Sequence, residues 1–519
     1  MNRYLICALI TVLVTGCSTS AKSPKTPPAS DTAAEMPRLS GIVRENVDDS
    51  VRAQDDFFRY VNGNWLKKAE IPADKSIWGA FAELRENTRP ELRTLIEAAA
   101  RNPAAAPGSE ERKIGDLYAS FMDEDTLETL GLRPLAAEFA RVAALTDKRQ
   151  IPALIAHFNR IGADAPYDLS IGQDARASTK YAVILSQSGL GLPDRDYYLK
   201  DDDAKLKAVR AKYLAHIEKM LKMAEDRNPT ASARAILALE TAIAKTQWTK
   251  VRNRDPVQTY NKTAIARLPE LTPGYPWATY LQDVGIARKV DYVIVSQPSY
   301  FTDFGRLWKT TSLPAWKAYF KWRLLSAYAR YLPKAYADEH FAFYGTALSG
   351  VPQNQARWKR GVTLVEGAIG EGLGKLYVAK YFPPETKAHM ERLVRNLLAA
   401  YRTSIDALDW MSPATKKEAQ AKLARFNTKI GYPNKWRDYT RMRIVKDDLI
   451  GNVRRANAFE YQRNIDKLGH SIDREEWAMT PQTVNAYYDP EKNEIVFPAA
   501  ILQPPFFNAK ADDAVNYGA

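Results

Sequence analysis

Cysteine is almost absent from this sequence. Its 519 residues include only two, Cys7 and Cys17, and both lie close to the start. A chain with no further thiols cannot rely on disulfide bridges, so its stability must come from packing. If Cys17 is acylated, as its context below predicts, no cysteine nucleophile remains in the body of the chain.

Histidine is also scarce. The five residues are scattered as His157, His216, His340, His389 and His470. Many zinc hydrolases carry two histidines one helical turn apart, as in H-E-x-x-H, and no such pair occurs here. A site built from three distant histidines stays open, but surface or capping roles explain each one more simply. A G-x-S-x-G nucleophile elbow is absent as well.

The apolar run that begins the sequence is short. Arg3 precedes Tyr4–Thr15, and about twelve apolar residues are too few to span a bilayer but typical of a secretory signal. The run closes on Val14-Thr15-Gly16-Cys17, which resembles the lipobox of bacterial lipoproteins. We therefore expect an exported protein, lipid-anchored through Cys17 in the bacterial cell envelope, facing the periplasm or in the outer membrane. The alternative is an ordinary signal peptide that contains a cysteine.

A sustained basic run is missing despite a formal charge of +13. Lysine and arginine alternate with acidic residues along most of the chain, which argues against nucleic-acid binding and favours a solvated basic surface near anionic lipid. With 45% hydrophobic and 26% charged residues, the composition is that of a globular protein. Its length favours two domains.

Helical periodicity dominates from about Asp48 onward, after a Ser-, Ala- and Pro-rich tether. Strand patterns are few. Tyr167–Gly172 with Tyr181–Gln187 predicts one hairpin, and Thr483–Tyr488 with Glu494–Phe497 predicts a second. The expected fold class is therefore mainly α with small β-hairpins.

Two further sequence patterns are better explained by structural roles than by functional ones. Gly367–Lys375 resembles a phosphate loop, but Ile369 stands where its first glycine belongs and Leu376 where Ser or Thr would bind magnesium. Its glycines are better explained by close helix packing or a bend. The run Asp201–Asp203 precedes a predicted helix, where negative charge is favourable.

Eight stretches, taken in order, carry a family resemblance. They are Asp55–Trp65, Gly189–Tyr198, Leu373–Tyr377, Trp410–Ser412, Lys429–Pro433, Val484–Tyr488, Ile495–Phe507 and Asn516–Gly518. Each is weak alone, but the ordered set resembles the neprilysin and endothelin-converting-enzyme family of zinc metallopeptidases. The resemblance runs from about residue 46 to the last residue.

The resemblance implies a mostly helical fold with two interconnected domains around a central cavity that admits peptides. The implied segments are 1–17 as signal peptide, 18–45 as flexible tether, 46–434 as N-terminal helical domain, 435–482 as helical connection and 483–519 as the beginning of a thermolysin-like catalytic domain. In the family, the H-E-x-x-H helix and a third glutamate ligand follow the Asn-Tyr-Gly stretch. The zinc ligands and catalytic residues are therefore expected beyond Ala519, which predicts an inactive fragment with no family zinc site.

Three positions are carried over from the family's motifs. Asn485 and Ala486 match the pair that holds an extended peptide on an edge strand by main-chain hydrogen bonds, a role for which an amide is well suited. The alternative is an ordinary hairpin edge with Asn485 bonded internally. Ile77 stands where neprilysin has an arginine linked to recognition of a peptide's C-terminal carboxylate, so internal cleavage with little carboxylate preference is implied for a complete protein.

Two functions remain open from the sequence. The first is the N-terminal part of a membrane-anchored zinc endopeptidase acting on peptides. The second is a non-enzymatic envelope lipoprotein that binds peptides or has a structural role. We also expect Phe497, Ile501, Leu502, Phe506 and Phe507 to be exposed, because their partners are expected to lie beyond Ala519.

Overall fold

The computed structural model describes residues 42–518, which belong to one compact unit. The signal segment, Cys17 and residues 18–41 lie outside the described residues. Within 42–518, no helix is both long and apolar enough to cross a bilayer. The predicted boundaries at 434/435 and 482/483 stay predictions, because the described residues do not separate there.

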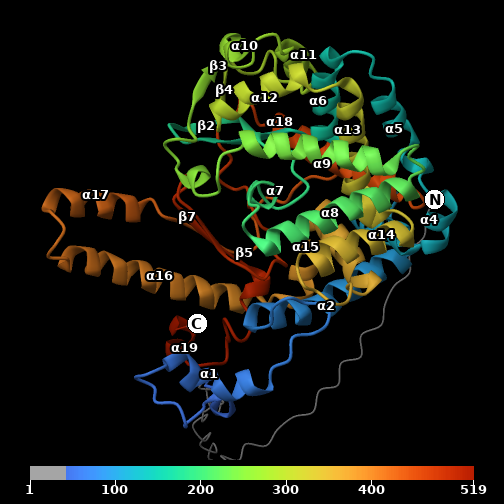
Figure 1. Ribbon diagram of the computed structural model, residues 1–519. Helices are drawn as coiled ribbons and strands as arrows, with labels where there is room; N and C mark the ends of the chain where they lie inside the picture. The colour runs from blue at the N-terminus through green and yellow to red at the C-terminus, as the bar shows by residue number, and fades with distance from the viewer. Residues whose placement is uncertain (1–41, 519) are drawn as a thin grey trace, which may run out of the picture. The chain divides into compact units, whose positions relative to one another are not determined.

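Helices make up most of the described chain (Figure 1). Those in its first half are α1 (Phe57–Lys68), α2 (Ala80–Arg101), α3 (Glu110–Met122), α4 (Glu124–Leu130), α5 (Ala136–Ala143), α6 (Ile151–Ile161), α7 (Asp196–Leu199), α8 (Ala204–Met223) and α9 (Pro229–Thr246). Those in its second half are α10 (Leu268–Leu271), α11 (Trp277–Asp283), α12 (Pro298–Thr310), α13 (Leu313–Tyr328), α14 (Lys334–Phe341), α15 (Arg357–Tyr381), α16 (Pro384–Ala407), α17 (Pro413–Ala424), α18 (Leu449–Ile465) and α19 (Asp513–Gly518). The prediction of a mainly α fold is confirmed.

Local capping explains where several of these helices begin. The Asp203 carboxylate accepts hydrogen bonds from the backbone N–H groups of Lys205 and Leu206, so the acidic run starts α8 as predicted. Ser412 caps α17 through the N–H of Thr415, and proline occupies the next position. In the segment expected to be a helical connection, 435–482, only α18 is α-helical and loops flank it.

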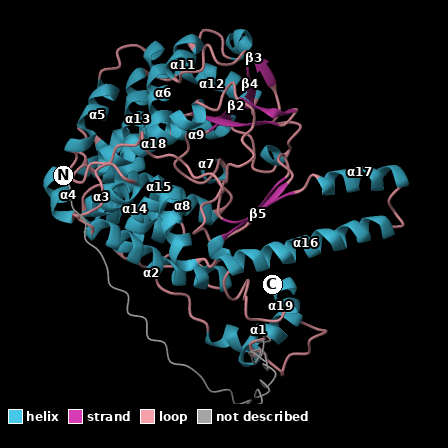
Figure 2. Ribbon diagram, turned by 180° about the vertical axis from the view of Figure 1, so that it is seen from behind, coloured by secondary structure: helices cyan, strands magenta, loops and turns pink. Residues whose placement is uncertain are grey.

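The strands form two small sheets, drawn in magenta in Figure 2. The first has the order β1-β2-β4-β3, with β1 (Tyr167–Asp174), β2 (Ala177–Gln187), β3 (Lys262–Ala264) and β4 (Tyr292–Val295). β1 and β2 pair antiparallel from Tyr167↔Gln187 onward, so the first predicted hairpin is confirmed. β4 pairs parallel to β2 and antiparallel to β3.

The second sheet has the order β5-β7-β6, with β5 (Asn427–Gly431), β6 (Tyr487–Asp489) and β7 (Glu494–Pro498). β6 and β7 pair antiparallel, which confirms the second predicted hairpin, although its first strand begins four residues later than Thr483. β5 pairs parallel to β7. This order leaves β6 at an edge.

Aromatic side chains fill the core of the helical body. The hydroxyl groups of Tyr167 and Tyr275 are 2.7 Å apart, and both residues are buried. The ring of Tyr167 also packs edge-on against Tyr280 and Phe304, with centroid distances of 5.0 and 5.5 Å. Edge-to-face packing of this kind stabilises a core beyond the area it buries, so a chain without body disulfides holds together by ring packing.

The glycine-rich part of α15 allows close contact with the loop that follows α18. A Cβ on Gly370 would lie 2.7 Å from the Thr480 side chain, and one on Gly374 would lie 2.8 Å from Pro481. The helix also departs from helical geometry at Ile369, with φ −129° and ψ 40°. The structural interpretation of these glycines, close packing with a bend, is confirmed.

The expectation that the last apolar segment is exposed is wrong. Ile501, Leu502 and Phe507 are only 3–6% exposed. The ring of Phe506 lies 4.3 Å from that of Phe81 on α2, centroid to centroid, and Phe497 is half-buried. Phe81 on α2 and His389 on α16 supply ring partners to Phe506 and Phe507, where partners beyond Ala519 had been expected.

Candidate functional site

The edge strand β6 is the element on which the predicted site depends. It pairs with β7 through Tyr487↔Val496, Tyr488↔Ile495 and Asp489↔Glu494. Its other edge has no strand partner within residues 42–518. An open edge offers backbone N–H and C=O groups to an extended ligand, which is how peptides add to a sheet.

Asn485 and Ala486 lie immediately before β6, not within it. Asn485 is exposed, and its N–H donates to the Thr483 carbonyl at 3.0 Å. The Ala486 N–H donates to the Asn485 side-chain oxygen at 2.9 Å. Half of the amide is therefore bonded internally, while its NH₂ group has no hydrogen-bond partner among the described residues. The donor capacity that peptide binding needs is still free.

Consecutive residues of β6 face opposite sides of the sheet, as strand geometry requires. The Tyr487 hydroxyl accepts a hydrogen bond of 2.9 Å from the Ala478 N–H on one side. Tyr488, together with its cross-strand partner Ile495, lines a groove on the other side. A peptide running along this edge would present alternate side chains to these two environments.

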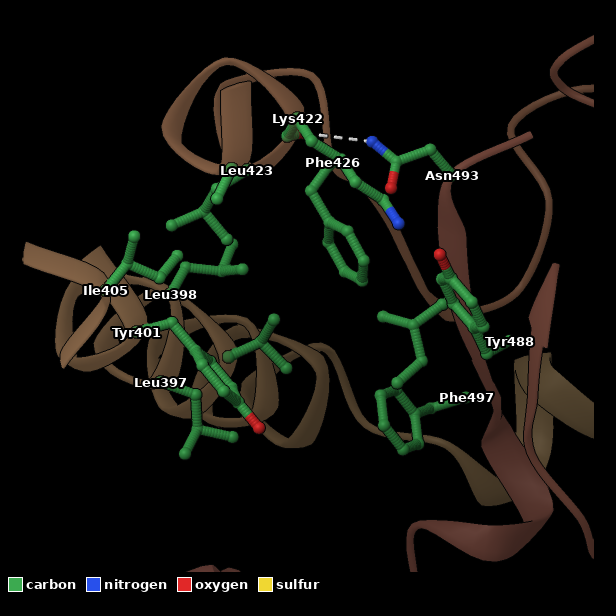
Figure 3. Close-up of a pocket in the computed structure, with 13 residues that line it drawn as sticks. Leu397, Leu398, Tyr401, Ile405, Lys422, Leu423, Phe426, Tyr488, Asn493 and Phe497 are labelled. Carbon is green, nitrogen blue, oxygen red and sulfur yellow. Dashed lines mark hydrogen bonds between the residues drawn. The ribbon is translucent and has the colours of Figure 1, made fainter. Parts of the chain in front are cut away.

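The groove beside Tyr488 is apolar and has a volume of about 390 Å³. Figure 3 shows Leu398 and Tyr401 of α16 facing Tyr488 and Phe497 of the sheet across it. Phe426 stacks on Tyr488 with ring centroids 6.0 Å apart. Tyr401 is 61% exposed, so large apolar side chains remain open to solvent in this groove.

A polar pocket of about 440 Å³ lies next to the loop that leads into Asn485. Most of its acidic groups are paired, as in Arg437–Glu371 and Lys467–Glu476. Glu366 lines the pocket and has no hydrogen-bond or ion-pair partner among the described residues. Burial raises the pKa of Glu366 to about 7, with Arg89 only partly opposing the shift. Glu366 is therefore the titratable group of this pocket near neutral pH.

The histidines do not form a zinc site. His157, His216 and His389 each pair with a separate carboxylate: Glu138 at 2.6 Å, Glu339 at 2.9 Å and Asp513 at 2.8 Å. Within residues 42–518, no three His, Cys, Asp or Glu side chains gather so as to hold a metal ion. A tetrahedral zinc site needs such convergence, so these residues do not fit the metal.

Ile77 lies in the loop before α2 and is 70% exposed. Its side chain carries no donor, so it cannot bind a carboxylate as an arginine fork does. The loop is fixed a few residues earlier, where the Ala73 carbonyl accepts from the N–H of Gln353. The structure thus presents an apolar residue to solvent at this position.

The comparisons with known proteins agree with the motifs. Residues 53–433 match the N-terminal profile of peptidase family M13, and residues 485–519 match the second profile of the same family. The chain belongs to peptidase family M13. The second match includes β6 and the predicted pair Asn485 and Ala486.

Relatives in the M13 family are similar over nearly the whole chain. Endothelin-converting enzyme 1 of Mus musculus is 30% identical over 95% of this chain and 66% of its own length. The Homo sapiens enzyme is 30% identical over 92% of this chain and 64% of its own length. This chain therefore spans slightly less than two thirds of these curated relatives.

Solved M13 structures share the fold. The inhibitor complex of Mycobacterium tuberculosis zinc metalloprotease Zmp1 superposes with a TM-score of 0.89 at 43% identity, covering 93% of this chain and 73% of that one. PepO from Lactobacillus rhamnosis HN001 gives a TM-score of 0.79 at 25% identity, covering 90% of this chain and 74% of that one. The family expected from the motifs is confirmed.

Sequence reasoning missed the apolar groove. Its signal was present in α16, where Leu397, Tyr401 and Ile405 recur every four residues and place an apolar stripe on one face. Periodicity identifies such a stripe but not what lies against it. Only the position of the small sheet shows that the stripe is left partly uncovered.

Proposed function

We propose that this chain is the peptide-holding part of an M13 zinc endopeptidase of the bacterial cell envelope. It binds an extended peptide along the edge of β6, with Asn485 and Ala486 at one end. The observation that carries the proposal is the open edge itself, with an apolar groove on one face and free amide donors at Asn485. Zmp1 is described as a zinc metalloprotease in complex with an inhibitor, which supports a peptidase role.

Residues 42–518 do not bring a set of zinc ligands together, so we do not assign the zinc chemistry of the family to them. Zinc in such enzymes activates a water molecule and polarises a carbonyl group. The contribution of the described residues is to hold the peptide by main-chain hydrogen bonds and to select its side chains. We therefore propose that these residues bind peptides without cleaving them.

The location follows from the first residues of the sequence. A lipid on Cys17 would tether the protein to a membrane in the envelope, and the basic composition suits an anionic lipid surface. Metabolic labelling with a fatty acid tests this. Label in the parent protein and its loss in Cys17→Ala supports the anchor, whereas a labelled Cys17→Ala protein contradicts it.

A second candidate function is a non-enzymatic lipoprotein that binds peptides. It is favoured by the burial of Ile501, Leu502 and Phe507, because these apolar side chains are covered by residues within 42–518. Both candidates share the peptide site. They differ in whether an M13 zinc helix acts with it, which the nucleotide sequence downstream of codon 519 in several isolates would decide.

A peptide-binding experiment tests the shared site. Purified chain from residue 18 onward is titrated with a library of fluorescent extended peptides, and dissociation constants are measured by polarisation. Asn485→Ala removes the amide donors and should raise the dissociation constant about tenfold. This corresponds to a loss of about 1.4 kcal/mol of binding free energy. Asn485→Asp keeps the acceptor that holds the Ala486 N–H but lacks the NH₂ group, so it should weaken binding to a similar extent.

The matched control is Asn228→Ala, which removes a cap of α9 in the helical body and should leave the dissociation constant unchanged. Elemental analysis and a chelator-sensitive cleavage assay accompany the titration. Absence of peptide binding, or an unchanged dissociation constant in Asn485→Ala, would contradict the proposed peptide site. Stoichiometric zinc with hydrolysis would contradict the proposal that these residues do not cleave.

A further inference from the structure

A cavity of about 380 Å³ lies away from β6, between α15 and the segment from η6 (Ala329–Tyr331) through α14 to η7 (Ala342–Ala347). We call it the arginine pocket, because Arg330 and Arg360 line it. His340, Tyr344 and Gln355 also contribute to its wall. η7 is a π-helical turn, a rare element that often occurs at functional sites.

Arg360 is the residue that makes this cavity unusual. Its side chain projects from α15, and its Nε is buried without a hydrogen-bond partner. The guanidinium lies 5.8 Å from the ring centroid of Phe121, and no carboxylate of the described residues forms an ion pair with it. Arg360 is half-buried, so its guanidinium has lost part of its hydration without gaining an ion pair.

Arg330 is a second cation without an ion pair. It is exposed at the rim of the pocket, and no described carboxylate lies within ion-pair distance of it. Arg357, one turn before Arg360 on α15, adds further positive charge, although it pairs with Glu124 at 3.1 Å. Burial lowers the pKa of Arg357, and Arg360 adds to this shift while Glu124 opposes it.

The acidic groups near the pocket are occupied elsewhere. Asp74, which lines the pocket, pairs with Lys359 at 2.9 Å and with Lys75 at 3.2 Å. Asp338 pairs with Lys334 one turn earlier in α14. These carboxylates make their ion pairs with lysines, and Glu124 and Asp338 favour the charge of Arg360 only from beyond ion-pair distance.

His340 adds a neutral ring to the wall. Burial, together with the nearby Arg330, lowers the pKa of His340 to about 3, so the imidazole is uncharged at neutral pH. Its ring centroid lies 4.7 Å from that of Tyr344. The Tyr344 hydroxyl already donates to the Gly191 carbonyl at 3.1 Å, so the neutral imidazole is the group of this pair that can donate a hydrogen bond without adding charge.

We propose that the arginine pocket binds a small oxyanion, a carboxylate or phosphate group, between Arg330 and Arg360. A guanidinium offers N–H donors in a planar fork that matches two oxygens of such a group. The Nε of Arg360 is enclosed by the protein, so the two terminal nitrogens of its guanidinium, which are not enclosed, are the donors that can face the anion. This site is separate from β6 and does not depend on the proposed peptide function.

The test measures anion binding to the whole chain in a low-chloride buffer of constant ionic strength. The probes are inorganic phosphate, N-acetylglycine and, as a neutral match, N-acetylglycinamide. We expect phosphate or N-acetylglycine to raise the thermal midpoint and to give a dissociation constant by calorimetry, while the amide has no effect. Binding by phosphate alone or by the carboxylate alone identifies which of the two oxyanions fits.

Two variants localise the effect. Arg360→Met should weaken anion binding at least about tenfold and, without anion, should not lower the thermal midpoint markedly, since the half-buried guanidinium makes no ion pair with the described residues. Arg330→Met, at an exposed position, should weaken binding without affecting folding. Arg392→Met on α16, an exposed arginine outside the pocket, should bind anion normally.

The contrary results are equally clear. Equal anion binding by the parent protein, Arg330→Met and Arg360→Met would overturn the proposal. So would absence of any response to both anions. A marked fall of the anion-free midpoint in Arg360→Met would show that the guanidinium stabilises the fold by itself, which contradicts the reasoning above.

Discussion

The helical body and the α16–α17 region use aromatic residues in opposite ways. In the body, the rings of Trp316, Tyr319 and Phe320 are fully buried and pack on one another at centroid distances of 5.3–5.8 Å. In the other region, Trp410 is 74% exposed and Tyr401 61% exposed. α16 and α17 extend beside β5 as a pair (Figure 2).

This contrast separates the residues that stabilise the fold from those available for binding. A region whose apolar surface is already covered contributes stability, whereas an apolar surface left open is a place where another chain can bind. The open edge of β6 borders the second region, with Tyr488 belonging to both. The following predictions test this division, from the largest expected effect to the smallest.

Replacing Trp316 with alanine should have the largest effect on stability. Its ring is 0% exposed, so the substitution leaves a cavity and should lower the free energy of unfolding by about 3–5 kcal/mol. The matched variant Trp410→Ala removes the same side chain from an exposed site and should change stability by less than about 0.5 kcal/mol. Urea unfolding followed by circular dichroism measures both. Similar losses of unfolding free energy in the two variants would contradict the division between a region that stabilises the fold and a region open for binding.

Glu366→Gln should change stability in a pH-dependent way. The pKa of Glu366 is about 7 in the folded chain against 4.5 when unperturbed, so the folded state keeps a proton that the unfolded state loses between these values. The stability this provides is complete below pH 4.5 and is lost as the pH rises through 7. The free energy of unfolding of the variant should therefore match that of the parent near pH 4.5 and exceed it by about 3 kcal/mol at pH 8.

The measurement is urea unfolding across this pH range, with Glu418→Gln on α17 as an exposed control that should follow the parent. A constant difference between Glu366→Gln and the parent at all pH values would show that the carboxyl does not titrate in this window.

Removing the cap of α17 should have a smaller effect. Ser412→Ala deletes the hydroxyl that accepts from the Thr415 N–H at 3.2 Å and should lower stability by about 1 kcal/mol. Ser412→Asn keeps a capping acceptor and should therefore have about the same free energy of unfolding as the parent. Because α17 lies in the open region, hydrogen exchange should show the loss there and not in α13. A loss spread over both helices would mean that the two regions unfold as one.

Polar substitution in the groove should leave stability almost unchanged. Leu397 is 39% exposed, so Leu397→Ser should alter the free energy of unfolding by less than about 0.5 kcal/mol. It should nevertheless reduce binding of a hydrophobic dye and self-association, measured by fluorescence and light scattering. Leu325→Ser in α13, fully buried, should instead unfold the protein. Unchanged dye binding in Leu397→Ser would show that the groove is not the exposed apolar surface of this chain.

Much of the local structure could be predicted from the sequence. Caps such as Asp203 and Ser412, the hairpin around Tyr167 and the helical glycines near Gly370 follow from neighbouring residues, because capping, strand alternation and close packing leave short-range patterns. The family also follows from short motifs in a fixed order. The peptide role of Asn485 and Ala486 rests on that resemblance and stays a proposal.

The sequence by itself determined the helices, the hairpins and the family, because these depend on residues close together in the chain or on motif order. Only the tertiary structure decided that Ile501, Leu502 and Phe507 are buried, because ring partners of this segment such as His389 and Phe81 are more than a hundred residues away along the chain. It likewise decided that Arg360 makes no ion pair with any residue in 42–518. Whether a charge is paired depends on which distant segments fold around it, and no local pattern records that.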